Sequence, residues 1–265
     1  MDLQLNNKVA LVTGGSLGIG KAVAIELARE GCMVAIAARR KELLEATASE
    51  ISDLTGSKII AIETDTSDPE QITKMIKRTN EELGPIQILV NNAAQVGGGG
   101  RNDSLLKGDE SLFFDDFNTK MMGYVRAARA VAPYMIDAGW GRIVIVSGMA
   151  TRQTAGVSGG MRNAAVTNLG SVLAQELGQY GINVNTIQPG GVLTESLGER
   201  LESQNKSSGL KVTDLIDQMG QANAIKHLVT AEEIAKVIAF LCSPLSISIS
   251  GESISVSGGS RAIHY

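Results

Sequence analysis

Short apolar runs alternate with longer amphipathic stretches along most of this chain. The runs have the length and the β-branched content of strands. They cover residues 9–12, 33–37, 59–62, 88–90, 143–146, 184–187 and 253–256. Their polar positions are few, which is typical of strands that are buried on both faces of a sheet.

The amphipathic stretches have lengths suited to helices that connect parallel strands. They begin near Ile19, Lys41, Pro69, Leu112, Gly159 and Ala231. This alternation predicts an α/β fold, with a doubly wound parallel sheet and helices on both of its faces. We expect a single domain over residues 1–265, because the chain shows no linker and no repeat. Mobile loops are expected at Gly97–Gly100 and at the polar segment Glu199–Gly209.

Charge and composition exclude several classes of function. The chain has 24 basic and 28 acidic residues, so a basic stripe for nucleic acid is not expected. No apolar run approaches the roughly 18 residues of a membrane span, and the first residues do not resemble a secretion signal. With only two cysteines and two histidines, a metal site is not expected either. These features predict a soluble, cytoplasmic protein with a small-molecule substrate and no membrane or nucleic-acid partner.

The first apolar run leads into the glycine-rich segment Thr13–Gly20, which is followed at once by a helical pattern. Glycines between a strand and a helix allow a tight turn and a close approach of the backbone to a pyrophosphate. The first turn of the helix then offers unpaired N–H groups to the phosphate. A bare structural turn is the alternative, but the position of the segment favours dinucleotide binding.

The end of the second run indicates which dinucleotide is bound. A free ribose 2′-hydroxyl calls for an acidic acceptor at this point, whereas a 2′-phosphate calls for a cation. The sequence has Arg39 and Arg40 there and no carboxylate. A guanidinium matches the geometry of phosphate oxygens, so NADP is expected and NAD remains possible. The alternative is that both arginines are ordinary solvated charges.

Three motifs give the chain a resemblance to the short-chain dehydrogenase/reductase family from about residue 5 to residue 259. Thr13–Gly20 is similar to the family's TGxxxGxG turn, Asn91–Ala94 to its NNAG segment, and Pro189–Thr194 to its PGxxxT segment. The resemblance implies a Rossmann fold with a seven-stranded parallel sheet, a nicotinamide cofactor, and a homodimer or homotetramer. It also implies a substrate lid at about residues 195–228, and an acidic residue, Asp65, at the adenine edge.

Together, the glycine turn, the two arginines and the resemblance predict a set of cofactor-binding residues. The set is Gly14, Ser16, Leu17, Gly18, Ile19, Gly20, Arg39, Arg40, Asp65, Thr66, Asn91, Ala93, Pro189, Gly190, Val192 and Thr194.

The catalytic residues implied by the resemblance are absent. In the register set by the surrounding motifs, Gly159 stands where the family has its Tyr and Asn163 where it has its Lys. Gly148 takes the place of the Ser, with Ser147 just before it, and Lys120 takes the place of the Asn. Glycine cannot donate a proton, and losing a positioned acid typically costs about 10²–10⁴-fold in rate.

Three functions are compatible with a chain that keeps the cofactor motifs and changes the catalytic ones. The first is an atypical NAD(P)-dependent oxidoreductase, acting on a carbonyl or alcohol by hydride transfer, with Lys120, Ser147 and Asn163 as the candidate catalytic residues. The second is a non-redox lyase or isomerase. The third is a nucleotide-binding pseudoenzyme or regulatory protein. We expect the Lys120 ammonium to be held by the Asn163 amide and to bind the nicotinamide ribose, with proton donation as a further role.

Overall fold

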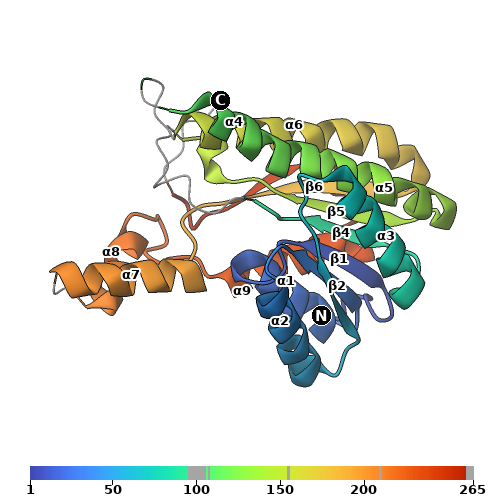
Figure 1. Ribbon diagram of the computed structural model, residues 1–265, viewed down its shortest axis with the longest axis horizontal. Helices are drawn as coiled ribbons and strands as arrows, with labels where there is room; N and C mark the ends of the chain where they lie inside the picture. Colours follow the sequence, from blue (N-terminus) through green and yellow to red (C-terminus); the bar gives the residue numbers. More distant parts are fainter. Residues whose placement is uncertain (95–105, 107, 154–155, 209–210, 261–265) are drawn as a thin grey trace.

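A computed structural model of the chain describes residues 1–94, 106, 108–153, 156–208 and 211–260. Seven strands pair in parallel in the order β3-β2-β1-β4-β5-β6-β7 (Figure 1). They are β1 (Val9–Thr13), β2 (Met33–Ala38), β3 (Ile59–Glu63), β4 (Ile88–Asn91), β5 (Gly141–Val146), β6 (Ile182–Pro189) and β7 (Ser253–Val256). The predicted doubly wound sheet is confirmed, and each predicted strand lies within an observed one.

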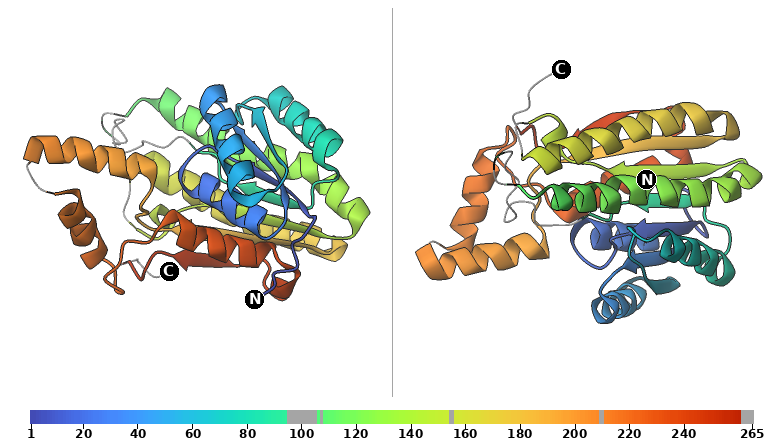
Figure 2. Two further views of the ribbon diagram at one scale, coloured as in Figure 1. Left: turned by 90° about the horizontal axis from the view of Figure 1, so that it is seen from below. Right: turned by 45° about the horizontal axis from the view of Figure 1, so that its top comes forward.

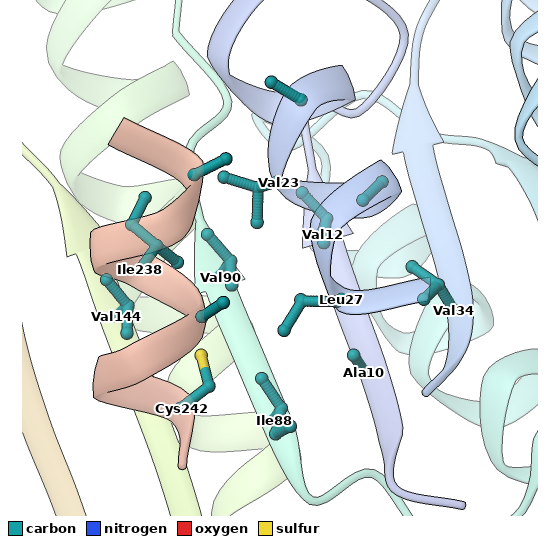
Figure 3. Packing of buried hydrophobic residues seen from close by; sticks show 14 of the residues in the cluster. Ala10, Val12, Val23, Leu27, Val34, Ile88, Val90, Val144, Ile238 and Cys242 are labelled. Carbon is teal, nitrogen blue, oxygen red and sulfur yellow. The ribbon is translucent and has the colours of Figure 1, made fainter. Parts of the chain in front are cut away.

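One face of the sheet is covered by α1 (Gly18–Arg29), α2 (Lys41–Thr55) and α9 (Ala231–Cys242). Figure 3 shows Val23 and Leu27 of α1 and Ile238 of α9 packed over Val12 and Val90. These side chains belong to alternate positions of the strands, because successive residues of a strand point to opposite faces. The helix α9 begins at a capping box, in which Thr230 and Glu233 bond each other's backbone N–H.

The opposite face is covered by α3 (Pro69–Leu83), α5 (Gly123–Ala138) and α6 (Val157–Leu177). Leu11 of β1 and Leu89 of β4 point to this side, while their neighbours Val12 and Val90 point to the other. Both faces of β1, β2 and β4 are therefore mostly apolar, which explains why their sequences contain so few polar residues, whereas β6 buries four polar side chains, those of Asn183, Asn185, Thr186 and Gln188.

A single run of helical turns crosses this second face. It begins as α4 (Glu110–Phe117), continues as a π-helical turn η1 (Asn118–Met122), and goes on as α5. The π turn changes the angular position of the side chains that follow. Within it, Thr119 and Lys120 point inward and are buried.

The segment after β6 corrects one of our expectations. Residues 199–208 were expected to form a mobile loop, but they belong to α7 (Glu195–Ser208), which is followed by α8 (Val212–Gln221). These two helices project from the body of the molecule (Figures 1 and 2) and share a small apolar cluster. The cluster contains Leu197, Leu201, Leu215 and Leu228. In the sequence, the many polar residues of α7 obscure its two buried leucines, Leu197 and Leu201. The other loop prediction, Gly97–Gly100, lies outside the described residues.

Short 3₁₀ turns complete the described structure: η2 (Met149–Thr151), η3 (Gly178–Tyr180) and η4 (Pro244–Ser246). Among the described helices, none is both long enough and apolar enough to span a membrane.

The packing of α9 leads to a test of the core. Ile238 is fully buried, so Ile238→Ala should lower the free energy of unfolding by about 2–5 kcal/mol through lost burial and the cavity left behind. The control is Ile247→Ala, because Ile247 is 68% exposed, and its effect should stay within about 0.5 kcal/mol. Urea unfolding of both variants measures the difference, and equal stabilities would contradict this packing.

Candidate functional site

The predicted site residues gather where the strands end. Gly14 follows β1, Arg39 follows β2, and Asn92 follows β4. Ser147 follows β5 and Gly190 follows β6. Because all strands are parallel, their carboxyl ends lie at one edge of the sheet, and this edge is where open α/β folds bind ligands.

The glycine turn after β1 is held in shape by Asn92. Its Nδ2 donates to the carbonyl oxygens of Thr13 and Gly14, each at 3.1 Å, and its backbone N–H donates to Thr13 Oγ1 at 3.0 Å. Gly14 has φ +68°, and a Cβ on Gly20 would lie 2.1 Å from the Gly14 carbonyl oxygen. Glycine is therefore required at both positions.

The turn presents the start of α1 to the strand edge. Leu17, at the N-cap, supplies no side-chain cap, and no acidic residue lies in the first turn of the helix. The Gly18 N–H donates instead to Glu195 Oε2 at 2.9 Å. Thr194 lies beside the same glycine, with Cγ2 3.3 Å from the position of a Gly18 Cβ. The structure thus brings the first and the last cofactor motifs together.

The remaining predicted cofactor residues differ in exposure. Arg39 and Arg40 are exposed at the end of β2, without an ion pair to any described residue. Asp65 is partly exposed, and its Oδ1 accepts from the Ser67 N–H and hydroxyl. Thr66 and Asn91 are buried: Thr66 donates to the Thr119 carbonyl, and Asn91 to the Tyr124 carbonyl. The side chains of Thr66 and Asn91 therefore form hydrogen bonds inside the protein rather than at its surface.

The other members of the set lie around these groups. Ser16 is buried, with its carbonyl oxygen accepting from Thr47, whereas Leu17, Ile19 and Ala93 are partly exposed. After β6, Pro189 is buried at the strand end and Gly190 packs against Ser257. Val192 is partly exposed between Gly190 and Thr194.

A second group of residues surrounds Lys120. Its ammonium Nζ donates to Asn163 Oδ1 at 2.7 Å and to the Ser147 carbonyl oxygen at 3.0 Å. The contact with Asn163 is the one expected from the sequence. Lys120 is only 4% exposed, and the ring of Tyr124 lies 5.9 Å from Nζ. The Tyr124 hydroxyl donates to the Val146 carbonyl oxygen at 3.2 Å.

Burial sets the charge of this lysine. Desolvation lowers the pKa of Lys120 from its ordinary 10.5 to about 7, and the Arg162 guanidinium acts in the same direction. The Asp116 carboxylate acts in the opposite direction and favours the charged form. A lysine with such a pKa is able both to hold and to release a proton near neutral pH.

Ser147, the second candidate catalytic residue, turns its hydroxyl away from this group. Its Oγ donates to the Asn163 carbonyl oxygen at 2.9 Å and lies 2.9 Å from Thr167 Oγ1. The hydroxyl therefore fastens β5 to α6, while the carbonyl oxygen holds Lys120.

Asp116 and Ser158, which the sequence motifs do not single out, lie close to this group. Asp116 on α4 forms an ion pair with Arg162, and it accepts a hydrogen bond from the Ser158 hydroxyl. It therefore ties α4 to the first two turns of α6, on either side of Gly159. The signal in the sequence was weak, since Asp116 lies next to a second aspartate in an otherwise aromatic stretch.

Comparison with known proteins agrees with this geometry. Residues 8–205 match the family model described as short chain dehydrogenase. A 3-oxoacyl-[acyl-carrier-protein] reductase, FabG of Pseudomonas aeruginosa, is 32% identical over 97% of this chain and 98% of its own length.

Two solved structures extend the similarity to three dimensions. L-Sorbose reductase from Gluconobacter frateurii, complexed with NADPH and L-sorbose, is 28% identical with a TM-score of 0.91, over 98% of each chain. An actinorhodin polyketide ketoreductase with NADPH is 28% identical with a TM-score of 0.86, over 95% of this chain and 96% of that one. From the family match and these relatives, the chain belongs to the short-chain dehydrogenase/reductases, a family of oxidoreductases.

Proposed function

We propose that this protein is an NADP-dependent oxidoreductase that interconverts a carbonyl compound and an alcohol without the tyrosine acid of its family. The observation that carries the proposal is the buried Lys120 ammonium. Asn163 and the Ser147 carbonyl oxygen hold it at the edge of the sheet where the strands end. It gives the site a cation and a titratable proton where the family's lysine and tyrosine are missing.

The residues present fit a dinucleotide. The glycine turn has no Cβ in the way of a pyrophosphate, and the N-terminus of α1 favours an anion, as its Gly18 N–H shows by donating to a carboxylate oxygen. Thr194 adds a side chain from the opposite side. We propose that these groups hold the pyrophosphate and that Asp65 lies at the adenine edge.

The two arginines after β2 support NADP over NAD. Their exposure and their lack of a carboxylate partner among the described residues leave both guanidinium groups available to a 2′-phosphate. Two of the similar structures were solved with NADPH, which points in the same direction.

Lys120 supplies the other half of the proposed site. A bound nicotinamide supplies the hydride. Two of the three hydrogens on the Lys120 ammonium are engaged by Asn163 and Ser147, and we assign the third to the nicotinamide ribose and to proton transfer, directly or through water. The lowered pKa suits this role, because a general acid works best when its pKa is near the working pH.

The substrate would lie beneath α7 and α8, the helices that project beyond the strand ends. We propose that they cover it as a lid. The reductases among the relatives act on different molecules, so the proposal stops at a carbonyl or alcohol of small size.

A first test concerns the cofactor. Calorimetry should find that NADPH binds about ten- to a hundredfold more tightly than NADH, because charge-assisted hydrogen bonds to the 2′-phosphate contribute roughly 1.5–3 kcal/mol. Arg39→Ala should remove most of this preference, whereas Arg29→Ala, a change of an exposed arginine at the far end of α1, should keep it. Equal affinities in the parent protein would contradict the proposal.

A second test concerns Lys120. In reduction, kcat/KM should fall as the pH rises through about 7, because the protonated lysine is the acid. Lys120→Met should lose this pH dependence and most of the rate, and its NADPH affinity should drop by about 1.5–3 kcal/mol. NADPH consumption is followed over a panel of ketones and α-diketones, with cyclohexanone and 2,3-butanedione as fixed probes.

The same variant has a stability signature. Between about pH 7 and 10.5 the unfolded chain binds more protons at this lysine than the folded chain does. The stability of the parent relative to Lys120→Met should therefore rise with pH over this range, by at most about 1.4 kcal/mol per pH unit. A pH-independent difference would contradict the low pKa.

Tight NADPH binding without consumption of NADPH on any carbonyl would instead favour the nucleotide-binding regulatory protein.

A further inference from the structure

The orientation of the Asn163 amide is fixed by its neighbour. Lys120 Nζ donates to the Asn163 side chain and to the Ser147 carbonyl oxygen. Because an ammonium group has only donors, the Asn163 atom that faces it is the carbonyl oxygen Oδ1. The Nδ2 group of Asn163 must then point away from Lys120. The assignment of oxygen and nitrogen in this side chain thus follows from the hydrogen bonds.

Nδ2 points toward Gly148. A Cβ built on Gly148 would lie 3.0 Å from this nitrogen, closer than a side chain can sit without displacing the amide. Among the hydrogen bonds of the described residues, none is donated by Asn163 Nδ2, although the residue is only 6% exposed. Nδ2 is not among the fully buried polar atoms that lack a partner, so this donor is open to the surroundings and is suited to a ligand oxygen.

We infer that Asn163 Nδ2 donates to the reacting oxygen of the substrate, in the space that Gly148 leaves free. The inference rests on the proposed function. In reduction, the carbonyl carbon would receive the hydride that a bound nicotinamide gives up, the electron pair of the C=O π bond would move to oxygen, and that oxygen would take a proton from the Lys120 ammonium to give the alcohol. An N–H held against the oxygen stabilises the negative charge that develops on it. Lys120 is then also a positioning residue, because it aims the amide.

Two variants test this assignment. Asn163→Asp keeps the shape of the side chain, removes the donor and raises the pKa of Lys120, so kcat is compared at a pH where Lys120 is protonated in both proteins, and it should be lower by about 10²–10³-fold. Gly148→Ala places a methyl group against Nδ2 and should lower kcat by about tenfold or more. The control is Gly160→Ala, whose Cβ would meet its nearest neighbour at an ordinary 3.8 Å, and which should leave kcat unchanged.

The dissociation constant of NADPH shows whether Asn163 Nδ2 donates to the substrate or to the cofactor. If the donor serves the substrate, NADPH binding to Asn163→Asp and Gly148→Ala should stay within about twofold of the parent. Weaker NADPH binding at an unchanged kcat would overturn the inference in favour of the cofactor. A kcat within about threefold of the parent in Asn163→Asp would overturn it outright.

A measurement without turnover keeps this test separate from the proposed function. In protein labelled with ¹⁵N-asparagine and loaded with NADP⁺, cyclohexanone or 2,3-butanedione should shift one side-chain amide signal that Asn163→Asp lacks. A shift without any NADPH consumption would contradict the proposed reaction and support the donor. An unmoved Asn163 signal with an active enzyme would contradict the donor and leave the reaction standing.

An independent observation concerns Glu195, the first residue of α7. Its Oε2 accepts from the Gly18 N–H at 2.9 Å, within the turn whose shape fits a pyrophosphate. The Glu195 carboxylate and a pyrophosphate are both anions, and both would take the N–H groups at the N-terminus of α1, so they compete for the same position. We propose that the Glu195–Gly18 contact is autoinhibitory: cofactor binding displaces the carboxylate and frees the start of α7 from α1.

The test is a change of charge at one position. Glu195→Gln should bind NADPH about three- to tenfold more tightly than the parent, while Glu199→Gln, one turn further along α7, should bind as the parent does. In the parent, NADPH should also speed hydrogen exchange at the start of α7. An equal or lower affinity in Glu195→Gln contradicts the contact as a competitor. Absence of NADPH binding from both proteins would contradict the cofactor site itself.

Discussion

A parallel sheet that is covered by helices on both faces offers few positions for polar functional side chains. The arrangement of this molecule follows from that constraint. The faces of the strands are filled by two apolar layers, with Leu11 on one side and Val12 on the other. The polar side chains of the proposed site lie where the strands end, in the turns after β1, β2, β4, β5 and β6, although β5 and β6 also bury polar side chains such as Arg142 and Asn185 within the sheet. Every contact invoked for cofactor or substrate lies at this edge.

The buried ammonium of Lys120 is the least expected feature of that edge. A charge in such a place is costly unless hydrogen bonds surround it. Here the π turn between α4 and α5 points the lysine inward, and Asn163 and the end of β5 provide its acceptors. The Asp116–Arg162 pair lies nearby. Its guanidinium lowers the pKa of the lysine and its carboxylate raises it. Burial makes the charged form of Lys120 unfavourable, and for the same reason it lowers the pKa, so that the ammonium can release its proton near neutral pH.

The sequence was sufficient for the fold and for the outline of the site, but not for its details. Strand positions follow from apolar runs of limited length, and all seven were predicted within a few residues. The helix α7 was not, because its apolar positions, Leu197 and Leu201, are separated by charged residues and read as a loop. The Lys120–Asn163 contact was expected from their matched positions. The inward turn of the Ser147 hydroxyl, the Asp116 ion pair and the Glu195–Gly18 contact depend on how side chains of different elements meet, which no local pattern encodes.

The changed residues of the site depend on one another physically. A lysine at position 163 would place a second ammonium next to the buried Lys120, and two like charges in one desolvated space are strongly unfavourable. A serine at position 148 would push its Cβ to within 3.0 Å of the Asn163 amide. With Lys120 on η1, position 163 therefore favours a short amide, and that amide in turn favours glycine at 148. One cation and one amide remain in the cluster, but the cation now enters from the π turn, and the free N–H of the amide faces the strand edge.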